Sequence, residues 1–388
     1  KVGNIVQKSI SSASARYKKV VKSEYGESYG CMYKTKSIDE LGRETRCTYD
    51  NDYGYLFSTT DHNGFVTLNE KDPLGINDVV VLPDGMIKTR VLRWAKNNQH
   101  APLGSTYYTW EKSTGMAETM VFYHKIGVEL RRVSFDINGK AIYVDKKYDD
   151  CGNLICESLP YYVEDDKYCI SYVFDRFNRL IEKRLPNSVV YEIHYDGNDV
   201  TTECISTDGK RRITKDKYNF MGWMIGVEDA GGNEIIYDYY SDGLVKSAAI
   251  ANNPKMKLTV TYDNLRNKKT LYDPNYGLVS YRYDAFGNLL KVVDPNGGTI
   301  EFVYDALGRK MSRSENTPVN AKNKFTRWIY DEEKGKDGML KSVVSDNHQV
   351  DYVYDSQLRL VSTIESIKGN EYKTTYNYDP ANRVSCVI

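Results

Sequence analysis

One segment of the sequence has the residue types of a serine nucleophile. Residues 26–30 (GESYG) have the Gly-x-Ser-x-Gly spacing of a hydrolase nucleophile elbow, in which a strand leads into a sharp turn and then a helix. The next residues, 31–36 (CMYKTK), have the pattern of a strand, and none of the five histidines has a supporting context. An enzyme with Ser28 as nucleophile is therefore the least favoured hypothesis. We predict an ordinary turn, no catalytic residue and no enzyme.

Two further groups of residues suggest metal chemistry. Residues 50–54 (DNDYG) alternate carboxylates before a glycine, as calcium loops do, but no bidentate glutamate ends the segment. The cysteines form no CxxC pair, and we predict small, buried free thiols; they are Cys31, Cys47, Cys151, Cys156, Cys169, Cys204 and Cys386. No glycine-rich loop could cradle a phosphate. We therefore predict no metal and no cofactor.

The composition excludes several classes of partner. The 388 residues contain 53 Lys+Arg and 53 Asp+Glu, whereas nucleic-acid-binding proteins usually carry a basic excess. No apolar run approaches the ~18 residues of a membrane span. We predict no nucleic-acid partner and no membrane span. Tyrosine is abundant, with 34 residues against 10 Phe and 4 Trp. Since tyrosine favours strands and tolerates a half-wet surface, this composition predicts a thin sheet with two partly solvated faces.

The chain repeats itself, which is the strongest signal in the sequence. An aromatic residue followed by Asp or a similar residue recurs every 21 to 26 residues over more than half the chain. The copies are Tyr148-Asp149, Phe174-Asp175, Tyr195-Asp196, Tyr218-Asn219, Tyr240-Ser241, Tyr262-Asp263, Tyr283-Asp284, Tyr304-Asp305, Tyr330-Asp331, Tyr354-Asp355 and Tyr378-Asp379. Looser copies occur before residue 148.

The copy at 279–304 shows what one unit contains. Residues 279–283 (VSYRY) alternate like a strand with two distinct faces. Residues 284–287 (DAFG) have the Asp and Gly of a type I turn, and Gly287 supplies the left-handed conformation that closes a hairpin. A return strand and a second turn at 294–297 (DPNG) follow. Each unit is therefore predicted to be two strands and two turns.

Other copies keep or vary this chemistry. Asn178 and Asn382 replace the glycine and tolerate the same conformation, whereas Arg266 and Leu358 predict turns of a different kind. Residues 241–243 (SDG) predict a shorter, two-residue hairpin turn. The residues to which we assign structural roles in the repeat and its turns are Tyr148, Asp149, Gly152, Tyr218, Gly222, Tyr262, Asp263, Tyr283, Asp284, Gly287, Tyr304, Asp305, Gly308, Tyr354, Asp355, Tyr378 and Asp379.

Tandem hairpins predict the fold class. Antiparallel hairpins linked in series form one long sheet, and a sheet of more than ~10 strands must curl, split or close. Since strand twist has a fixed hand, continued addition produces a spiral that can enclose space. We predict an all-β fold of tandem antiparallel β-hairpins in one long curved sheet, part or all of a hollow shell, with almost no helix. The insertion 331–338 (DEEKGKDG) is predicted to be a solvated loop tip.

The chain divides into three parts by the quality of the repeat. Residues 1–36 lack the unit and are predicted to be a lead-in segment, either extended or flexible. Residues 37–132 carry degenerate copies. Residues 133–388 carry regular copies, which stop within a repeat at Ile388 before any core or toxin region.

The motifs resemble those of the YD-repeat, or Rhs (rearrangement hot spot), family. Residues 281–289 and 302–309 match its unit, roughly Tyr-x-Tyr-Asp-x-x-Gly-Arg-Leu, nearly throughout. The segment 123–148, followed by 160–162 (PYY), is similar to the repeats of bacterial polymorphic toxins and of the B/C shell proteins of Tc toxins. The resemblance is clear from about residue 120 to the end. The self-cleaving aspartates of the family's core region have no counterpart here.

The resemblance implies a structural role and a location. In that family the repeats form a hollow β-shell that encloses a C-terminal toxin, so the implied partners are the rest of the same polypeptide or a delivery component, and the implied location is secreted or cell-surface. The alternative is a recognition module that binds glycan or a surface protein through its tyrosine-rich sheet. Aromatic residues exposed in a row would favour recognition, and aromatic residues packed between strands would favour encapsulation.

Overall fold

The structure is a computed structural model that describes residues 4–11, 18–318 and 320–388. The described residues form 33 strands in one sheet and a single short 3-10 helix, Glu27–Tyr29. The predicted all-β class is confirmed. Among the described residues, no helix is long and apolar enough to span a bilayer.

The strands follow one another with short turns between them. The first third contains β1 Gln7–Ser11, β2 Lys18–Tyr25, β3 Lys34–Ile38, β4 Glu44–Tyr49, β5 Leu56–Thr60, β6 Val66–Lys71, β7 Asp78–Val81, β8 Ile87–Trp94, β9 Ser105–Ser113, β10 Thr119–His124 and β11 Glu129–Phe135. The middle contains β12 Ala141–Tyr148, β13 Leu154–Ser158, β14 Cys169–Phe174, β15 Leu180–Arg184, β16 Val190–Asp196, β17 Asp199–Ile205, β18 Arg211–Tyr218, β19 Met224–Glu228, β20 Glu234–Tyr239, β21 Val245–Ile250 and β22 Asn253–Tyr262. The last third contains β23 Lys268–Asp273, β24 Gly277–Tyr283, β25 Leu289–Val293, β26 Thr299–Tyr304, β27 Lys310–Thr317, β28 Asn320–Tyr330, β29 Leu340–Ser345, β30 His348–Tyr354, β31 Leu360–Ile367, β32 Asn370–Tyr378 and β33 Val384–Val387.

Each strand pairs antiparallel with the strands before and after it in the chain. In the pair β24–β25, for example, Ser280 lies opposite Val293, and the register shifts between Arg282 and Tyr283, just before the turn. The same shift precedes the turns after β26, β28 and β30. A bulge of this kind increases local twist, so bulges in successive units help the sheet to curl.

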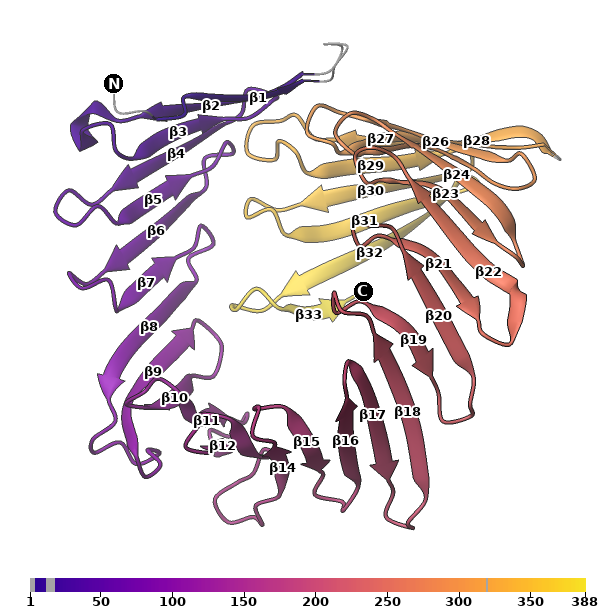
Figure 1. The fold of residues 1–388 in the computed structure, drawn as a ribbon. Coiled ribbons are helices and arrows are strands. Elements are labelled where there is room, and N and C mark those ends of the chain that lie inside the picture. The colour runs from indigo at the N-terminus through magenta and orange to yellow at the C-terminus, as the bar shows by residue number, and fades with distance from the viewer. Residues whose placement is uncertain (1–3, 12–17, 319) are drawn as a thin grey trace.

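The sheet curls around on itself without closing. In Figure 1 it descends from β3 to β9, runs along the bottom, rises through β19 to β22 and crosses the top near β26. The last strands, β29 to β33, then descend facing the first arm. Strands β1 and β2, residues 7–11 and 18–25, lie within the segment predicted to be a lead-in, and β2 pairs with β3. The three-part division of the chain stays a prediction.

Burial is concentrated in one part of the sheet. A cluster that we call the hub consists of Ala95, Tyr108, Phe122, Val133 and Tyr143, with Phe122 and Val133 fully buried. The segments that link β8 to β9 and β13 to β14, residues 95–104 and 159–168, contribute Ala95, Ala101 and Tyr161 to it. Elsewhere the sheet is a single layer with partly exposed faces. This fits the abundance of tyrosine, whose ring packs on the sheet while its hydroxyl stays in contact with water.

Candidate functional site

In most units the joint of the sheet is built around one aspartate, which Asn219 and Tyr240 replace in two of them. At the turn after β24, Asp284 Oδ1 accepts hydrogen bonds from the backbone N–H groups of Phe286 and Asn288, both at 2.8 Å. Gly287 takes a left-handed conformation with φ 86°, and its N–H donates to the Asp284 carbonyl. This is a three-residue hairpin loop made of a type I turn and a left-handed residue. The carboxylate therefore satisfies N–H groups that the strand ladder leaves free.

In several units the tyrosine ties this joint to the preceding strand. The Tyr304 hydroxyl donates to the Leu289 carbonyl at 2.9 Å, so β26 is fastened to the start of β25. Equivalent bonds join Tyr195 to Leu180, Tyr354 to Leu340 and Tyr378 to Leu360. Burial raises the pKa of Tyr304 and Tyr354, so these hydroxyls remain protonated donors at neutral pH.

Several turns add an arginine that links neighbouring hairpins. Arg309 donates from Nε to Asp305 Oδ2 at 2.6 Å, and its guanidinium carbon lies 4.1 Å from the centre of the Tyr330 ring on β28. Arg359 makes the same pair of contacts with Asp355 and Tyr378. A planar guanidinium suits both partners because it bonds a carboxylate at its edge and stacks on a ring with its face.

The residues selected from the sequence lie at these joints. The aspartates that accept at least one backbone N–H of their own turn are Asp149, Asp263, Asp284, Asp305, Asp355 and Asp379. The glycines with a left-handed φ are Gly152, Gly222, Gly287 and Gly308. The side chain of Asn153 holds the pKa of Asp149 below its ordinary value. The tyrosines Tyr148, Tyr218, Tyr262, Tyr283, Tyr304, Tyr354 and Tyr378 each end the strand before such a turn.

Two expectations about turns are wrong. Arg266 and Leu358 do not change the turn: each is left-handed, with φ 68° and 60°, and donates its N–H to the aspartate at the start of its turn. The aspartate and the flanking ladder impose the conformation despite its usual cost of ~1–2 kcal/mol. The segment 241–243 is not a shorter hairpin, since Tyr239 bonds the Met224 carbonyl and Tyr240 takes the aspartate position of a full-length turn.

The structure gives the motif-like segments other roles. Residues 26–30 link β2 to β3 through the short 3-10 helix, so a strand follows where a nucleophile elbow needs a helix. Asp50 Oδ1 accepts from the N–H groups of Asp52 and Tyr53, which is hairpin chemistry. All seven cysteines lie in the described residues as free thiols, but none is fully buried, and Cys151 and Cys386 are exposed, contrary to the prediction of buried thiols.

The turns lie along the two long sides of the curled sheet, and the line where turns of one side contact turns of the other is what we call the seam. One side, the YD rim, carries the turns that follow the repeat tyrosines, such as 284–287, 305–308 and 379–382. The other side, the return rim, carries turns such as 39–42, 61–64, 82–85 and 114–116. At the seam, the YD rim of the last strands lies against the return rim of the first strands, as the facing arms of Figure 1 show.

Asp337 is the most connected residue of the seam. Its Oδ1 pairs with Arg43 Nη2 at 2.8 Å, its carbonyl lies 3.0 Å from His62 Nε2, and its N–H donates to Asn63 Oδ1 at 2.9 Å. The insertion 331–338 is therefore only in part the solvated loop tip that its composition predicts. Residues 332–334 are exposed, whereas Asp337 contacts a segment almost 300 residues away in the sequence. The sequence signal is weak, because a charged insertion looks the same whether or not it meets a partner.

Among the described residues, the seam has two further contact points, and cavities lie beside it. The Ala381 side chain lies against Gly115, where an added Cβ would be 2.2 Å from the Ala381 Cβ, and Asn382 donates to Asp84. Lys19 Nζ lies 4.9 Å from the centre of the Phe286 ring. A cavity of about 710 Å³ remains beside Asp337, lined by Arg43 from the first arm and by residues of β27 and β28. The seam is thus made of side chains and turns, whereas strand pairing holds the rest of the sheet.

The hub contains a buried charge that the sequence does not reveal. Asp145 on β12 accepts from Arg131 Nη2 at 2.9 Å and from the Tyr161 hydroxyl at 2.8 Å, and Lys167 also contacts it. Burial alone would raise the pKa of Asp145, but the hydrogen bonds from Arg131, Lys167 and Tyr161 outweigh it and hold the pKa well below its usual range. The cluster is a compensated ion network that fastens residues 159–168 onto the sheet.

Comparisons with known proteins agree with this geometry. A family model described as RHS Repeat matches residues 283–315. The fold is similar to the crystal structure of TcdB2-TccC3, with a TM-score of 0.65, 14% identity and 94% of this chain covered. It is also similar to the crystal structure of TcdB2-TccC3-TEV, with a TM-score of 0.67, 12% identity and 100% of this chain covered. The structure of the Photorhabdus luminescens Tc holotoxin pore is similar as well, with a TM-score of 0.66, 14% identity and 95% of this chain covered. No curated protein matches the sequence.

The repeat and the fold point to the same resemblance. Residues 283–315 match the RHS Repeat model, and the chain has the fold seen in the TcdB2-TccC3 structures. The resemblance to the YD-repeat, or Rhs, family inferred from the motifs is therefore confirmed. The chain spans 27%, 31% and 29% of the length of the three solved chains, so it corresponds to less than a third of each.

Proposed function

We propose that this chain is a wall segment of a secreted bacterial shell that sequesters a polypeptide cargo belonging to the same protein. The role is steric: the wall separates cargo from solvent and proteases and performs no chemistry of its own. The observation that carries the proposal is the seam. Because the YD rim of the last strands contacts the return rim of the first strands, successive parts of the sheet can form one continuous wall.

The part of the YD rim that lies outside the seam supports the proposal of a larger wall. Where the rim lies in the seam, Ala381 at the tip of its turn is covered, with 5% exposure. Tips elsewhere on the same rim are large, apolar and exposed, including Leu74 at 76%, Phe177 at 63% and Phe220 at 88%. A row of apolar tips suits further hairpins of the same kind, which would bury these tips as the seam buries Ala381.

The positions of the tyrosines favour encapsulation over recognition. The repeat tyrosines Tyr195, Tyr304, Tyr354 and Tyr378 are partly buried between strands and use their hydroxyls within the wall. A glycan-binding surface would instead present its rings in a row to solvent. Recognition of a glycan or surface protein stays a prediction, and saturable binding on a glycan array would support it.

Limited proteolysis of the full polypeptide tests the proposal. We expect cargo to resist protease when the wall is intact and to be cut faster in the double variant Asp337→Ala/Gly115→Val, which removes one seam contact and places a side chain against Ala381. Asp346→Ala is the matched control, because Asp346 lies in an exposed turn away from the seam. Cargo that is cut equally fast with and without the repeats would contradict encapsulation.

A further inference from the structure

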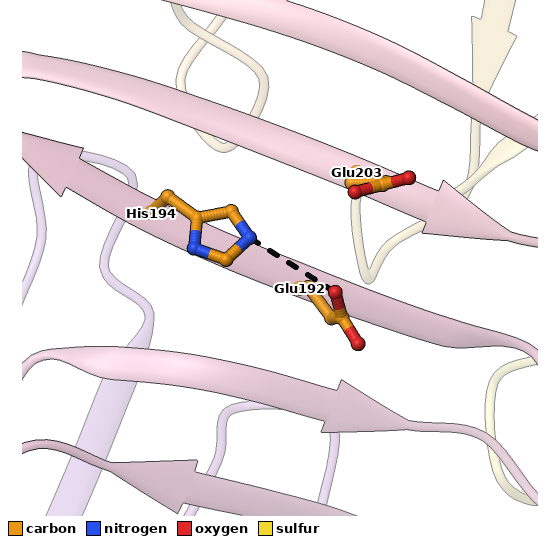
Figure 2. A group of neighbouring side chains, drawn as sticks. All are labelled: Glu192, His194 and Glu203. Carbon is orange, nitrogen blue, oxygen red and sulfur yellow. Dashed lines mark ion pairs between the residues drawn. The ribbon is translucent and has the colours of Figure 1, made fainter.

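Strands β16 and β17 bring together three side chains with metal-binding atoms. Glu192 and His194 lie on β16 and Glu203 lies on β17, and the ligand atoms of all three are within 4.8 Å of one another. Figure 2 shows the His194 ring directed toward Glu192, with Glu203 on the neighbouring strand. The three residues share a face because Glu192 lies directly opposite Glu203, and His194 is two positions along from Glu192.

The charge around Glu192 is unusually poorly compensated. Glu192 lies directly opposite Glu182 on one side and Glu203 on the other, so three carboxylates stand in one row across three strands. Like charges placed opposite each other destabilise a sheet. Arg184 pairs with Glu182 at 3.0 Å and Arg211 pairs with Glu203 at 2.7 Å, whereas the ion pair found for Glu192 is with His194 at 3.9 Å.

Another like-charged pair shows how the same sheet compensates such a row. Glu228 and Glu234 also lie directly opposite each other on β19 and β20. Lys215 pairs with Glu228 at 3.3 Å and Lys217 pairs with Glu234 at 2.6 Å, so each carboxylate has its own ammonium group. The corresponding cation for Glu192 is missing from the described residues, and an imidazole stands in its place.

We propose that Glu192, His194 and Glu203 form a binding site for a divalent transition-metal ion, with Zn²⁺ as the best match. Imidazole nitrogen and carboxylate oxygen are both zinc ligands, and a site with three protein ligands leaves the fourth position to water. Ligand atoms around tetrahedral zinc lie about 3.4 Å apart, given bonds of about 2.1 Å. Small rotations of the side chains of Glu192 and His194, which are 38% and 65% exposed, would close the set to that distance.

The site is compatible with the existing contact of Glu203. Arg211 binds one carboxylate oxygen, Oε1, so Oε2 remains available to a metal ion. The Glu203 side chain is only 12% exposed, which fixes its position on the sheet, while the two exposed ligands close over the ion. Bound metal would neutralise the carboxylate row and join the two strands on either side of the turn at Gly197.

Metal binding by the untagged full chain tests the site directly. In a competition titration with a chromophoric chelator we expect one Zn²⁺ per chain at this site, and both His194→Gln and Glu192→Gln should weaken its binding about tenfold or more. His348→Gln is the matched control, because His348 and Glu365 form an exposed two-residue pair on β30 and β31. That control should bind Zn²⁺ at the β16–β17 site as tightly as the wild type.

Two results would overturn the site. Unchanged Zn²⁺ affinity in His194→Gln, or equal loss in His348→Gln, would mean scattered adventitious binding. Displacement of Zn²⁺ by a modest excess of Ca²⁺ would mean an acidic patch without imidazole ligation, because a site containing imidazole prefers zinc to calcium. Circular dichroism of each variant in chelator confirms that the fold is intact, and Co²⁺ substitution gives a second readout through the visible spectrum of the bound ion.

Discussion

The hub and the regular wall around β22–β26 are built from the same kind of strand, but they are stabilised differently. In the hub, two segments fold back over the sheet, and Phe122 and Val133 lose all contact with solvent. In the wall, Val260 and Val279 are isolated buried residues, and turn aspartates and tyrosine hydroxyls connect successive strands. The wall can therefore be extended unit by unit, whereas the hub depends on contacts that no single unit contains.

The largest difference should appear when buried volume is removed from each region. Phe122→Ala should destabilise the hub by about 3–5 kcal/mol, since a fully buried ring is lost together with its packing. Val279→Ala should cost the wall only about 2 kcal/mol. Hydrogen exchange of hub and wall amides, measured alongside urea unfolding, separates the two effects. Equal losses would mean that the wall has a core comparable to the hub.

The next effect concerns the buried charge of the hub. Asp145→Ala should destabilise the protein by about 3 kcal/mol, because Arg131 and Lys167 would be left beside residues 159–168 without their anion. Urea unfolding monitored near the hub measures the loss. The exposed pair Lys246–Asp238 in the wall is the control, and Asp238→Ala should change stability by no more than about 0.5 kcal/mol.

The pH dependence of the same residue sharpens this test. The pKa of Asp145 is lowered in the folded protein, so its stabilising contribution is fully present above the unfolded value of about 3.9. The contribution is lost as the pH falls from there toward the folded pKa. The stability difference between wild type and Asp145→Ala should therefore be constant near neutrality and shrink below about pH 4. A difference that grows in acid would contradict the assignment.

A wall turn should show a smaller effect. Gly287→Ala places a side chain at φ 86°, where the added Cβ meets nothing closer than 3.7 Å, so the cost is conformational and should be about 1–2 kcal/mol. Arg266→Gly makes the reverse change at an equivalent turn and should not destabilise the wall. Thermal unfolding of both variants measures the pair. A destabilising Arg266→Gly would mean that its side-chain contacts with Asp242 outweigh the backbone cost.

The seam should show the smallest effect on global stability. Asp337→Ala removes a half-buried ion pair with Arg43 worth about 1 kcal/mol and leaves the strand ladder intact. We expect faster protease cleavage within 331–338 and little change in urea unfolding, with Asp346→Ala as control. Raising the salt concentration should speed cleavage of the wild type toward the rate of the variant, since screening weakens the pair. Cleavage that is insensitive to both changes would contradict a role for the pair in holding the seam.

Most of the wall could be predicted from the sequence because its causes are local. The turn at 284–287 follows from an aspartate, a glycine and the alternation before them, all within nine residues. The misjudged turns at Arg266 and Leu358 have a physical explanation: the ladder and the aspartate outweigh the preference of the fourth residue. The turn at 241–243 is misplaced by one residue in the sequence analysis because Tyr239 and Tyr240 are adjacent, and either could be the tyrosine that ends the strand.

The seam, the hub and the proposed metal site could not be predicted in this way. Arg43 and Asp337 are joined only after the sheet has curled, and Asp145 meets Lys167 only after residues 159–168 fold back. Glu192 and Glu203 are separated by a hairpin turn whose register decides whether they face each other. No spacing in the sequence encodes these distances.

The sequence alone thus determined the repeating hairpin, its turns and an all-β curved sheet, because backbone propensity and turn chemistry act over a few residues. The tertiary structure decided where that sheet meets itself, which insertion becomes a contact and where charge is buried. Those outcomes depend on twist accumulated over many strands, and a small change in twist per unit would bring different residues together at the seam.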